Sequence, residues 1–147
     1  MGEDTRWQRR HTLPHAIPSW IHGDATFFVT ICARGRCVNA LCIEPVPTTL
    51  IASLRAHETA TGWTLLACVL MPDHVHLLLS GRDPRAIVPP WKRYTARHLG
   101  IRWQRDFFEH RLRADDAVSA KVEYMRQNPV RAGLVATADA WPYLWVR

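Results

Sequence analysis

The sequence predicts an α+β domain, in which helices pack on an antiparallel sheet and a further helix follows at the C-terminal end. The 147 residues are 48% hydrophobic, which suits one compact domain with its own core. Segments with the two-residue alternation of strands and segments with helical spacing follow one another along the chain. No internal repeat or low-complexity stretch interrupts them. We therefore expect a single domain over residues 1–147.

The chain begins with a basic segment that we expect to form an extended arm. This arm covers residues 1–22 and contains Arg6, Arg9 and Arg10, but it has no apolar stretch typical of a signal peptide. No apolar run in the chain reaches the roughly 18 residues that a membrane span needs. We expect a cytoplasmic protein without a membrane partner, with a core over residues 23–128 and a C-terminal tail over 129–147.

The first strand and the first helix are predicted near the start of the core. Side chains alternate from Ala25 onward, as in a strand buried on both sides or nearly so. Thr48 or Thr49 can then cap a helix that ends near Gly62. The next two apolar runs, 63–71 and 74–80, are separated only by a Pro-Asp turn, which predicts a hairpin.

The second half of the core continues the alternation of helices and strands. Because Pro89 and Pro90 interrupt the pattern, we expect the second helix from about Pro90 to Leu99. Residues 102–113 suit an edge strand or an extended segment. A third helix starts at Asp115 or Asp116 and ends at Asn128, since the following proline disfavours helical geometry. This order is the split β-α-β pattern of a ferredoxin-like sheet, with an added C-terminal helix.

Two histidines lie in the second strand of the hairpin. His74 and His76 point to the same face, with α-carbons roughly 6.5 to 7 Å apart, so both rings can reach one metal ion. Val75 and its alternating neighbours occupy the other face, which we assign to the main core. An H-x-H pair alone is weak evidence, and taken alone it favours two incidental or hydrogen-bonded histidines over a metal site.

The third helix presents two neighbouring stripes. One stripe faces the core, and the other carries polar side chains; the stripes comprise Val118, Val122 and Met125, and Ala117, Lys121, Tyr124 and Asn128. A tyrosine at the margin of such a helix is usually a packing residue with its hydroxyl in water. The helix alone therefore leaves the role of Tyr124 open.

The charge of the chain indicates an anionic partner such as nucleic acid. The formal net charge is +6 and the pI is about 9.7. Only Lys92 and Lys121 are lysines, so 17 of the 19 basic residues are arginine. Arginine suits phosphate and bases, although a GC-rich genome produces the same bias. The four cysteines match no zinc-binding spacing, and we expect reduced, mostly buried thiols.

Two of these segments resemble a known family. Met71–Leu79 resembles the histidine-hydrophobe-histidine motif of HUH single-tyrosine transposases, and Glu123–Val135 resembles the tyrosine helix of their REP-associated branch. The resemblance runs from about Arg9 to Trp145 and includes two further segments, Phe27–Thr30 and Trp103–Arg113. It implies a ferredoxin-like core with the tyrosine on a helix after the fourth strand.

The resemblance also implies roles for individual residues. His74 and His76 match the metal ligands of the family, Tyr124 matches the nucleophile, and Asn128 matches a polar third ligand. The implied cofactor is a divalent metal ion, Mg²⁺ or Mn²⁺. Lys121 would stabilise the phenolate or the phosphate, or would be a solvated surface lysine.

The implied activity is cleavage and rejoining of single-stranded DNA beside a hairpin, through a 5′-phosphotyrosine intermediate, in a nucleoid-associated monomer or homodimer. Several basic residues are expected to bind this DNA: Arg6, Arg9, Arg10, Arg93, Arg97, Lys121 and Arg131. Trp7, Trp20, Trp91 and Trp103 are candidates for base stacking. Two alternatives stay open: a domesticated protein that binds hairpin DNA without cutting it, and a metal-dependent phosphoesterase that uses water as nucleophile.

Overall fold

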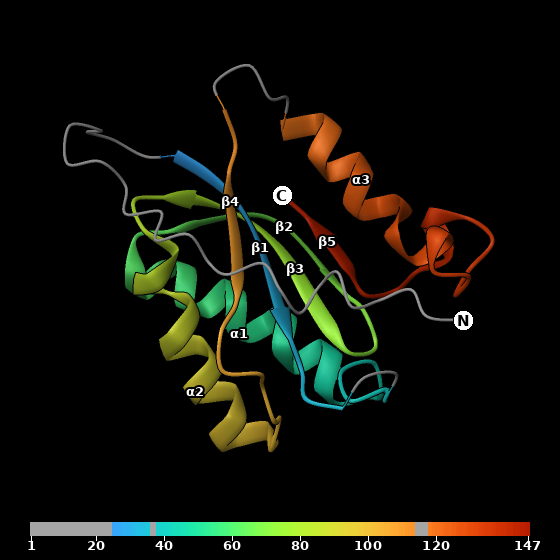
Figure 1. Ribbon diagram of the computed structural model, residues 1–147, viewed down its shortest axis with the longest axis horizontal. Coiled ribbons are helices and arrows are strands. Elements are labelled where there is room, and N and C mark those ends of the chain that lie inside the picture. The colour runs from blue at the N-terminus through green and yellow to red at the C-terminus, as the bar shows by residue number, and fades with distance from the viewer. Residues whose placement is uncertain (1–24, 36–37, 114–117) are drawn as a thin grey trace.

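The fold is an antiparallel sheet of five strands, as Figure 1 shows for the computed structural model. The structure describes residues 25–35, 38–113 and 118–147. Every neighbouring pair of strands is antiparallel, and the strand order is β4-β1-β3-β2-β5. The elements are β1 Ala25–Cys32, α1 Val46–Thr61, β2 Thr64–Leu70, β3 His74–Gly81, α2 Val88–Leu99, β4 Phe108–Arg111, α3 Val118–Arg131 and β5 Leu144–Val146. The predicted α+β class and the ferredoxin-like order of the first four strands are confirmed.

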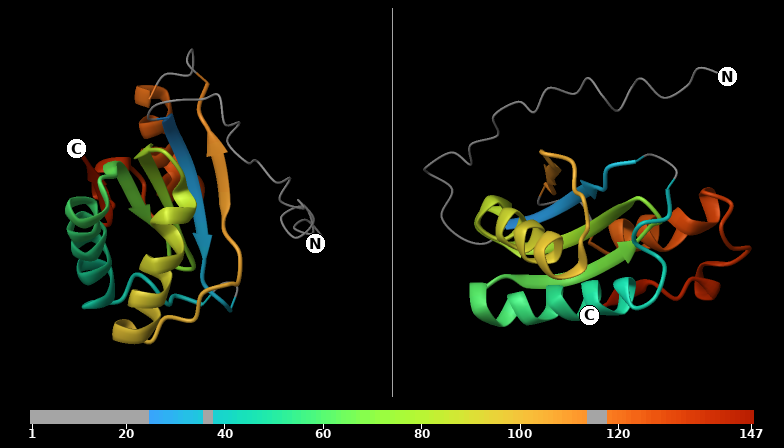
Figure 2. Two further views of the ribbon diagram at one scale, coloured as in Figure 1. Left: turned by 90° about the vertical axis from the view of Figure 1, so that its left-hand side faces the viewer. Right: turned by 90° about the horizontal axis from the view of Figure 1, so that it is seen from below.

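The helices divide between the two faces of the sheet. Helices α1 and α2 contribute Leu50 and Trp91 to the main core, together with Val29 and Leu77 from the sheet. Both helices run along this side of the sheet in Figure 2. Helix α3 contributes Met125 to a smaller cluster on the opposite face. Because side chains alternate along a strand, β1 and β3 supply residues to both clusters.

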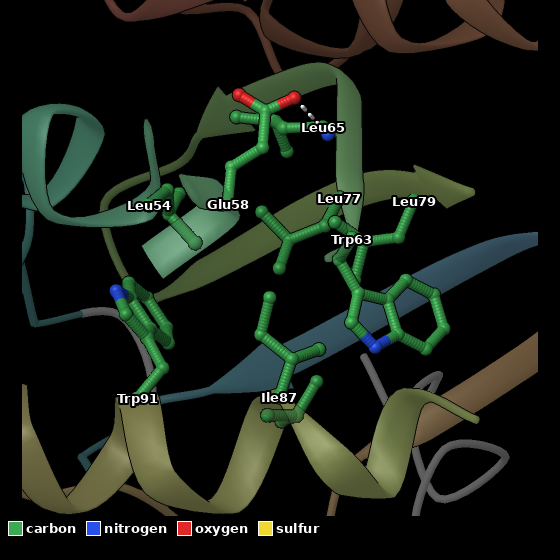
Figure 3. A pocket seen from close by; sticks show the side chains of 9 residues that line it. Leu54, Glu58, Trp63, Leu65, Leu77, Leu79, Ile87 and Trp91 are labelled. Atoms are coloured by element: carbon green, nitrogen blue, oxygen red, sulfur yellow. Dashed lines mark hydrogen bonds between the residues drawn. The ribbon is translucent and has the colours of Figure 1, made fainter. Parts of the chain in front are cut away.

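The main core is closely packed. A void of about 10 Å³ lies among apolar side chains between α1, α2 and the sheet (Figure 3), and this volume is no more than one water molecule needs. Glu58 at its border turns its carboxylate to the backbone N–H of Leu65, at 3.0 Å. This void is too small to hold a ligand.

Helix α1 begins earlier than the threonine caps predicted. Its first residue is Val46 and its N-cap is Pro45, so neither Thr48 nor Thr49 caps the helix. The Thr49 hydroxyl instead donates to the Pro45 carbonyl, at 2.8 Å. A proline in the first turn costs no hydrogen bond, because N–H groups there have no helical acceptor. The predicted end is confirmed, since Gly62 closes the helix at φ +73°.

The same reasoning corrects the start of α2. The helix was expected to begin at about Pro90, after an interruption at Pro89, but it begins at Val88 and both prolines lie in its first turn. Their missing N–H groups are again those that a helix leaves unpaired. Before α2, Asp83 caps a separate 3₁₀-helix, Pro84–Ala86, by accepting from the backbone N–H of Arg85.

Helix α3 does not end at Asn128. It continues through Pro129 to Arg131, and the predicted start at Asp115 or Asp116 lies outside the described residues. Pro129 is buried and removes only one helical hydrogen bond, while Leu134 N–H donates to the Pro129 carbonyl at 2.9 Å. Val118, predicted to face the core, is 39% exposed. It is the first residue of α3 and lies one turn before Val122, which packs against the smaller cluster.

Both edges of the sheet are short strands. Residues 102–113 were predicted to hold an edge strand, and β4 does pair only with β1. Strand β5 was not predicted, because residues 129–147 were expected to form a tail. It pairs with β2, and the Trp141 indole donates to the Leu70 carbonyl at 3.0 Å beside it. Three residues are too few for alternation to reveal a strand.

The cysteines of the described residues are free thiols. Cys68 is buried, and Cys32 and Cys42 are half-buried; Cys37 lies outside the described residues. Burial raises the pKa of Cys42 and of Cys68 to about 12, so both are unreactive at neutral pH. In the part of the chain that the structure describes, no helix has the length and apolar character needed to span a membrane.

Candidate active site

His74 and His76 lie side by side on the face of β3 that turns away from the main core. Their ring centroids are 4.7 Å apart. In the register of the sheet, His76 lies opposite Thr30 of β1, while Val75 belongs to the main core. The predicted arrangement of the two histidines is therefore what the structure shows.

The Nδ1 atom of each histidine has a hydrogen-bonding partner. His74 Nδ1 lies 2.7 Å from the Asp73 carboxylate, and His76 Nδ1 lies 2.9 Å from the Thr30 hydroxyl. A carboxylate accepts only from a protonated nitrogen, so Asp73 favours the form of His74 with the proton on Nδ1. Nε2 then remains as the ligand atom of that ring, and Thr30 can impose the same form on His76.

The surroundings of His76 keep its ring neutral. Burial, followed by the nearby His74, Lys121 and Arg131, lowers the pKa of His76 to about 3. Only 9% of His76 is exposed. A metal ion binds neutral imidazole, so this environment keeps His76 in its ligand form at neutral pH.

Tyr124 approaches the histidine pair from α3. The tyrosine is 45% exposed, so its hydroxyl is accessible to a large substrate. Its ring meets the edge of Phe28 of β1, with centroids 6.1 Å apart and planes at 80°. Phe28 in turn stacks on His76, at 5.0 Å and 24°. The two motifs that the sequence identified are thus joined through one aromatic ring.

Two cations flank the tyrosine. The Arg131 guanidinium lies 4.3 Å from the centroid of the Tyr124 ring, and Arg131 also donates to the Tyr124 carbonyl at 2.8 Å. The Lys121 ammonium lies 5.1 Å from that centroid and 4.5 Å from the centroid of Phe28. Two of the residues that were predicted to bind DNA, Lys121 and Arg131, therefore lie against the Tyr124 ring.

Asn128 lies one turn after Tyr124 on the same helix. Its amide nitrogen is buried and finds no hydrogen-bond partner among the described residues, which is uncommon for a buried polar atom. In that part of the chain, no group of three or more His, Cys, Asp or Glu side chains gathers around a metal position. A third protein ligand beside the histidines would therefore have to be of another kind, such as an amide oxygen.

The structure places Arg93 and Arg97 away from the histidines. Both lie on α2, which packs on the main core, whereas the histidines lie on the other face of the sheet. Arg93 borders a groove of about 500 Å³ between α2 and the segment that leads into β4. We call this the basic groove; its lining residues are Arg85, Pro89, Lys92, Arg93, Arg105, Asp106, Phe107 and Glu109.

The remaining predicted DNA contacts divide into two groups. Arg6, Arg9, Arg10, Trp7 and Trp20 lie outside the described residues. Trp91 and Trp103 are buried in the main core and donate to Ser53 and Thr95, so these two candidates are not available to stack on bases. Their indole rings pack against each other, with centroids 5.4 Å apart.

Sequence reasoning assigned no site role to Phe28 or Thr30, and it considered Asp73 only as a carboxylate available to a phosphoesterase. Asp73 directly precedes His74, so adjacency alone was a signal for its contact. Phe28 and Thr30 share a strand face, but only the pairing of β1 with β3 places that face against His76. No periodicity within β1 reveals which strand it meets.

Comparisons with known proteins agree with this architecture. The chain matches no protein-family profile. A curated protein of Haemophilus influenzae, provisionally named a REP-associated tyrosine transposase, is 33% identical over an alignment of 101 positions, and the match covers 54% of this chain. The chain spans 56% of that relative's length, or about half of it.

Two solved structures are similar. A REP-associated tyrosine transposase bound to a REP hairpin has a TM-score of 0.71 and 23% identity, over 85% of this chain and 78% of its own. A provisionally named transposase from Deinococcus radiodurans has a TM-score of 0.47 and 20% identity, over 75% and 93% of the two chains. In sequence and in fold, the chain thus resembles the REP-associated tyrosine transposases, as the motifs around His74 and Tyr124 predicted.

Proposed function

We propose that the protein is a metal-dependent endonuclease and strand transferase that acts on single-stranded DNA beside a hairpin. The observation that carries this proposal is the contact of Tyr124 with Phe28, and of Phe28 with His76. It gathers a nucleophile and two potential metal ligands, from motifs far apart in the sequence, on one face of the sheet. The sequence relative named as a transposase supports the same activity.

Three side chains would hold the metal ion, which we propose to be Mg²⁺ or Mn²⁺. They are His74 and His76 through Nε2, and Asn128 through its amide oxygen. The two histidines fit such an ion, because His76 is neutral and because Asp73 and Thr30 hold the Nδ1 atoms, which leaves Nε2 of each ring for the metal. When bound, the ion would polarise a non-bridging oxygen of the phosphodiester and neutralise developing charge.

Tyr124 would act as the nucleophile. Its phenolic oxygen forms a bond to phosphorus as the bond from phosphorus to the 3′-oxygen breaks, leaving 5′-phosphotyrosine and a free 3′-hydroxyl. The phenolic proton passes to water and the departing 3′-oxygen takes one up, so no net proton is gained or lost. A DNA hydroxyl can later displace the phenolate, so that rejoining needs no ATP. Lys121 and Arg131 would neutralise the phosphate during both steps.

Hairpin DNA is the substrate that we propose. A structure of similar fold is described as bound to a REP hairpin, and the net charge of +6 suits a polyanion. The basic groove offers four cationic side chains against two acidic ones on the face opposite Tyr124. One DNA molecule would therefore contact both faces of the sheet, with the strand to be cut at Tyr124.

The alternative is a domesticated protein that binds hairpin DNA without cutting it. Such a protein would need neither a paired set of histidines nor an accessible tyrosine beside them. A phosphoesterase with water as nucleophile would need further carboxylate ligands. Of the two carboxylates nearest the histidines in the sequence, Asp73 is hydrogen-bonded to His74 and Asp83 caps the 3₁₀-helix. A covalent adduct between protein and DNA distinguishes the proposed function from both.

The test is incubation of the protein with end-labelled, single-stranded hairpin DNA and Mg²⁺ or Mn²⁺, followed by denaturing electrophoresis. We expect a cleaved strand and a labelled band that migrates with the protein, both dependent on the metal. Cleavage without an adduct would favour the phosphoesterase. Tight hairpin binding without cleavage, with either metal, would favour the domesticated protein.

A further inference from the structure

We infer that Phe28 is a positioning residue, which sets Tyr124 at a fixed distance and angle from His76. This inference rests on the proposed function, in which Tyr124 is the nucleophile and His76 a metal ligand. Phe28 itself touches neither metal nor DNA in this scheme. It acts through the two rings that it contacts.

The contacts of Phe28 are specific in geometry. One flat face lies nearly parallel to His76, with centroids 5.0 Å apart, while Tyr124 meets the ring almost at a right angle, at 6.1 Å. Stacked and edge-to-face pairs are the two arrangements that aromatic rings favour. The Lys121 ammonium lies 4.5 Å from the same ring centroid. A single ring thus contacts the proposed ligand, the proposed nucleophile and one flanking cation.

The position of Phe28 in the sheet explains why it can join these residues. His76 belongs to β3 and Tyr124 to α3, and the aromatic contacts of the described residues include none between their rings. Phe28 belongs to the neighbouring strand β1, opposite Leu78 of β3 in the register. It therefore fills the space between the histidine and the tyrosine from a rigid element.

Folding alone does not require an aromatic ring at position 28. Its neighbour Phe27 is 3% exposed and packs in the main core against Trp63, where a large side chain is needed. Phe28 is only half-buried and lies at the margin of the smaller cluster. A branched aliphatic side chain would cover the same apolar neighbours there, but it has no flat face for the imidazole and no ring for the phenol to meet.

The two phenylalanines provide a matched pair of variants. Phe28→Leu retains apolar volume but loses both ring contacts. The side chains of His76 and Tyr124 then sample more conformations, and they must return to the reactive arrangement before the reaction can occur. Because small misplacements of reacting groups are costly, we expect adduct formation at saturating DNA to slow by about 10- to 100-fold. Phe27→Leu makes the same chemical change on the opposite face. We expect it to lower the melting temperature without slowing the reaction of the folded protein.

The experiment uses the full chain and a single-stranded hairpin oligonucleotide with saturating Mn²⁺. Three quantities are measured for the wild type, Phe28→Leu, Phe28→Tyr and Phe27→Leu. They are the rate of adduct formation at saturating DNA, the Kd for the oligonucleotide by fluorescence anisotropy, and the melting temperature by circular dichroism. Phe28→Tyr keeps the ring and should restore most of the rate.

A slower rate for Phe28→Leu with an unchanged Kd, together with rescue by Phe28→Tyr, would support the inference. A wild-type rate for Phe28→Leu would overturn it, and so would a loss of rate that only follows the loss of folded protein. Adduct formation by the wild type alongside either of these results leaves the proposed function standing. If the wild type formed no adduct, both the proposed function and the inference about Phe28 would be contradicted.

Discussion

His76 is held more tightly than His74, although the two rings lie two residues apart on one strand. His76 is stacked on Phe28, bonded to Thr30 and almost completely buried. The side chain of His74 is 26% exposed and depends on Asp73, whose own side chain is 31% exposed. Under the proposed function, removal of either ring should leave a single imidazole to hold the metal ion.

We therefore expect His74→Ala and His76→Ala to abolish cleavage of single-stranded hairpin DNA while hairpin binding is largely retained. Phosphate and base contacts outside the metal site would provide that binding. The measurement is adduct formation under metal-limited conditions, with Kd measured on the same samples. Cleavage at the wild-type rate by either variant would mean that the histidine is not a ligand.

The described structure also separates the three tyrosines. Tyr94 lies on α2 and contacts His98 and His57, and Tyr143 packs against the main core; only Tyr124 contacts the ring beside His76. We expect Tyr124→Phe to eliminate the DNA adduct, and Tyr94→Phe and Tyr143→Phe to retain it. Mass spectrometry of the DNA-linked peptide identifies the residue. A linked peptide that contains Tyr94 would contradict the assignment.

Two glycines at the ends of elements show how backbone and packing limit substitutions in different ways. A β-carbon at Gly62, where α1 ends at φ +73°, would meet no atom within 4 Å, so Gly62→Ala costs only conformational strain, about 1 kcal/mol. A β-carbon at Gly81, at the end of β3, would collide with the Trp63 ring. We expect Gly81→Ala to cost more, about 1 to 3 kcal/mol, in urea denaturation. The reverse order would mean that Trp63 moves away easily.

The first four strands and the hairpin could be predicted because their signals are local. Strand β5 was too short to give such a signal, and the other errors arose where a signal depends on its structural context. Pro89, Pro90 and Pro129 were each assigned to the boundary of a helix, but in a first turn, or at a buried position such as that of Pro129, a helix accommodates proline. His74, His76 and Tyr124 were found through motifs. The contact of Phe28 with His76 and Tyr124 could not be predicted, because the periodicity of one strand does not reveal its register with the neighbouring strand.

On the scale of the whole molecule, the sheet lies between two groups of positively charged side chains. On one face, Lys121 and Arg131 lie beside Tyr124, where they would act on a single phosphate. On the other, the basic groove runs between α2 and the segment before β4. Lys92 is already engaged there, because its ammonium donates to the carbonyls of Gln104 and Arg105, at 2.7 and 2.9 Å. The exposed arginines of the groove are left to meet DNA.

If the basic groove binds the hairpin, Arg93→Ala should weaken binding without changing the rate of cleavage at saturating DNA. Affinity should fall steeply with salt through counterion release, and removal of one phosphate contact should reduce the slope of log K against log salt by about one. Arg97→Ala is the matched comparison, since Arg97 lies on the same helix but does not line the groove. Its effect should be smaller. If the affinity of the wild type did not change with salt, the excess of arginine would reflect the composition of the genome and not contact with DNA. If Arg93→Ala and Arg97→Ala weakened binding equally, the charge of α2 would contribute to binding but the basic groove would not.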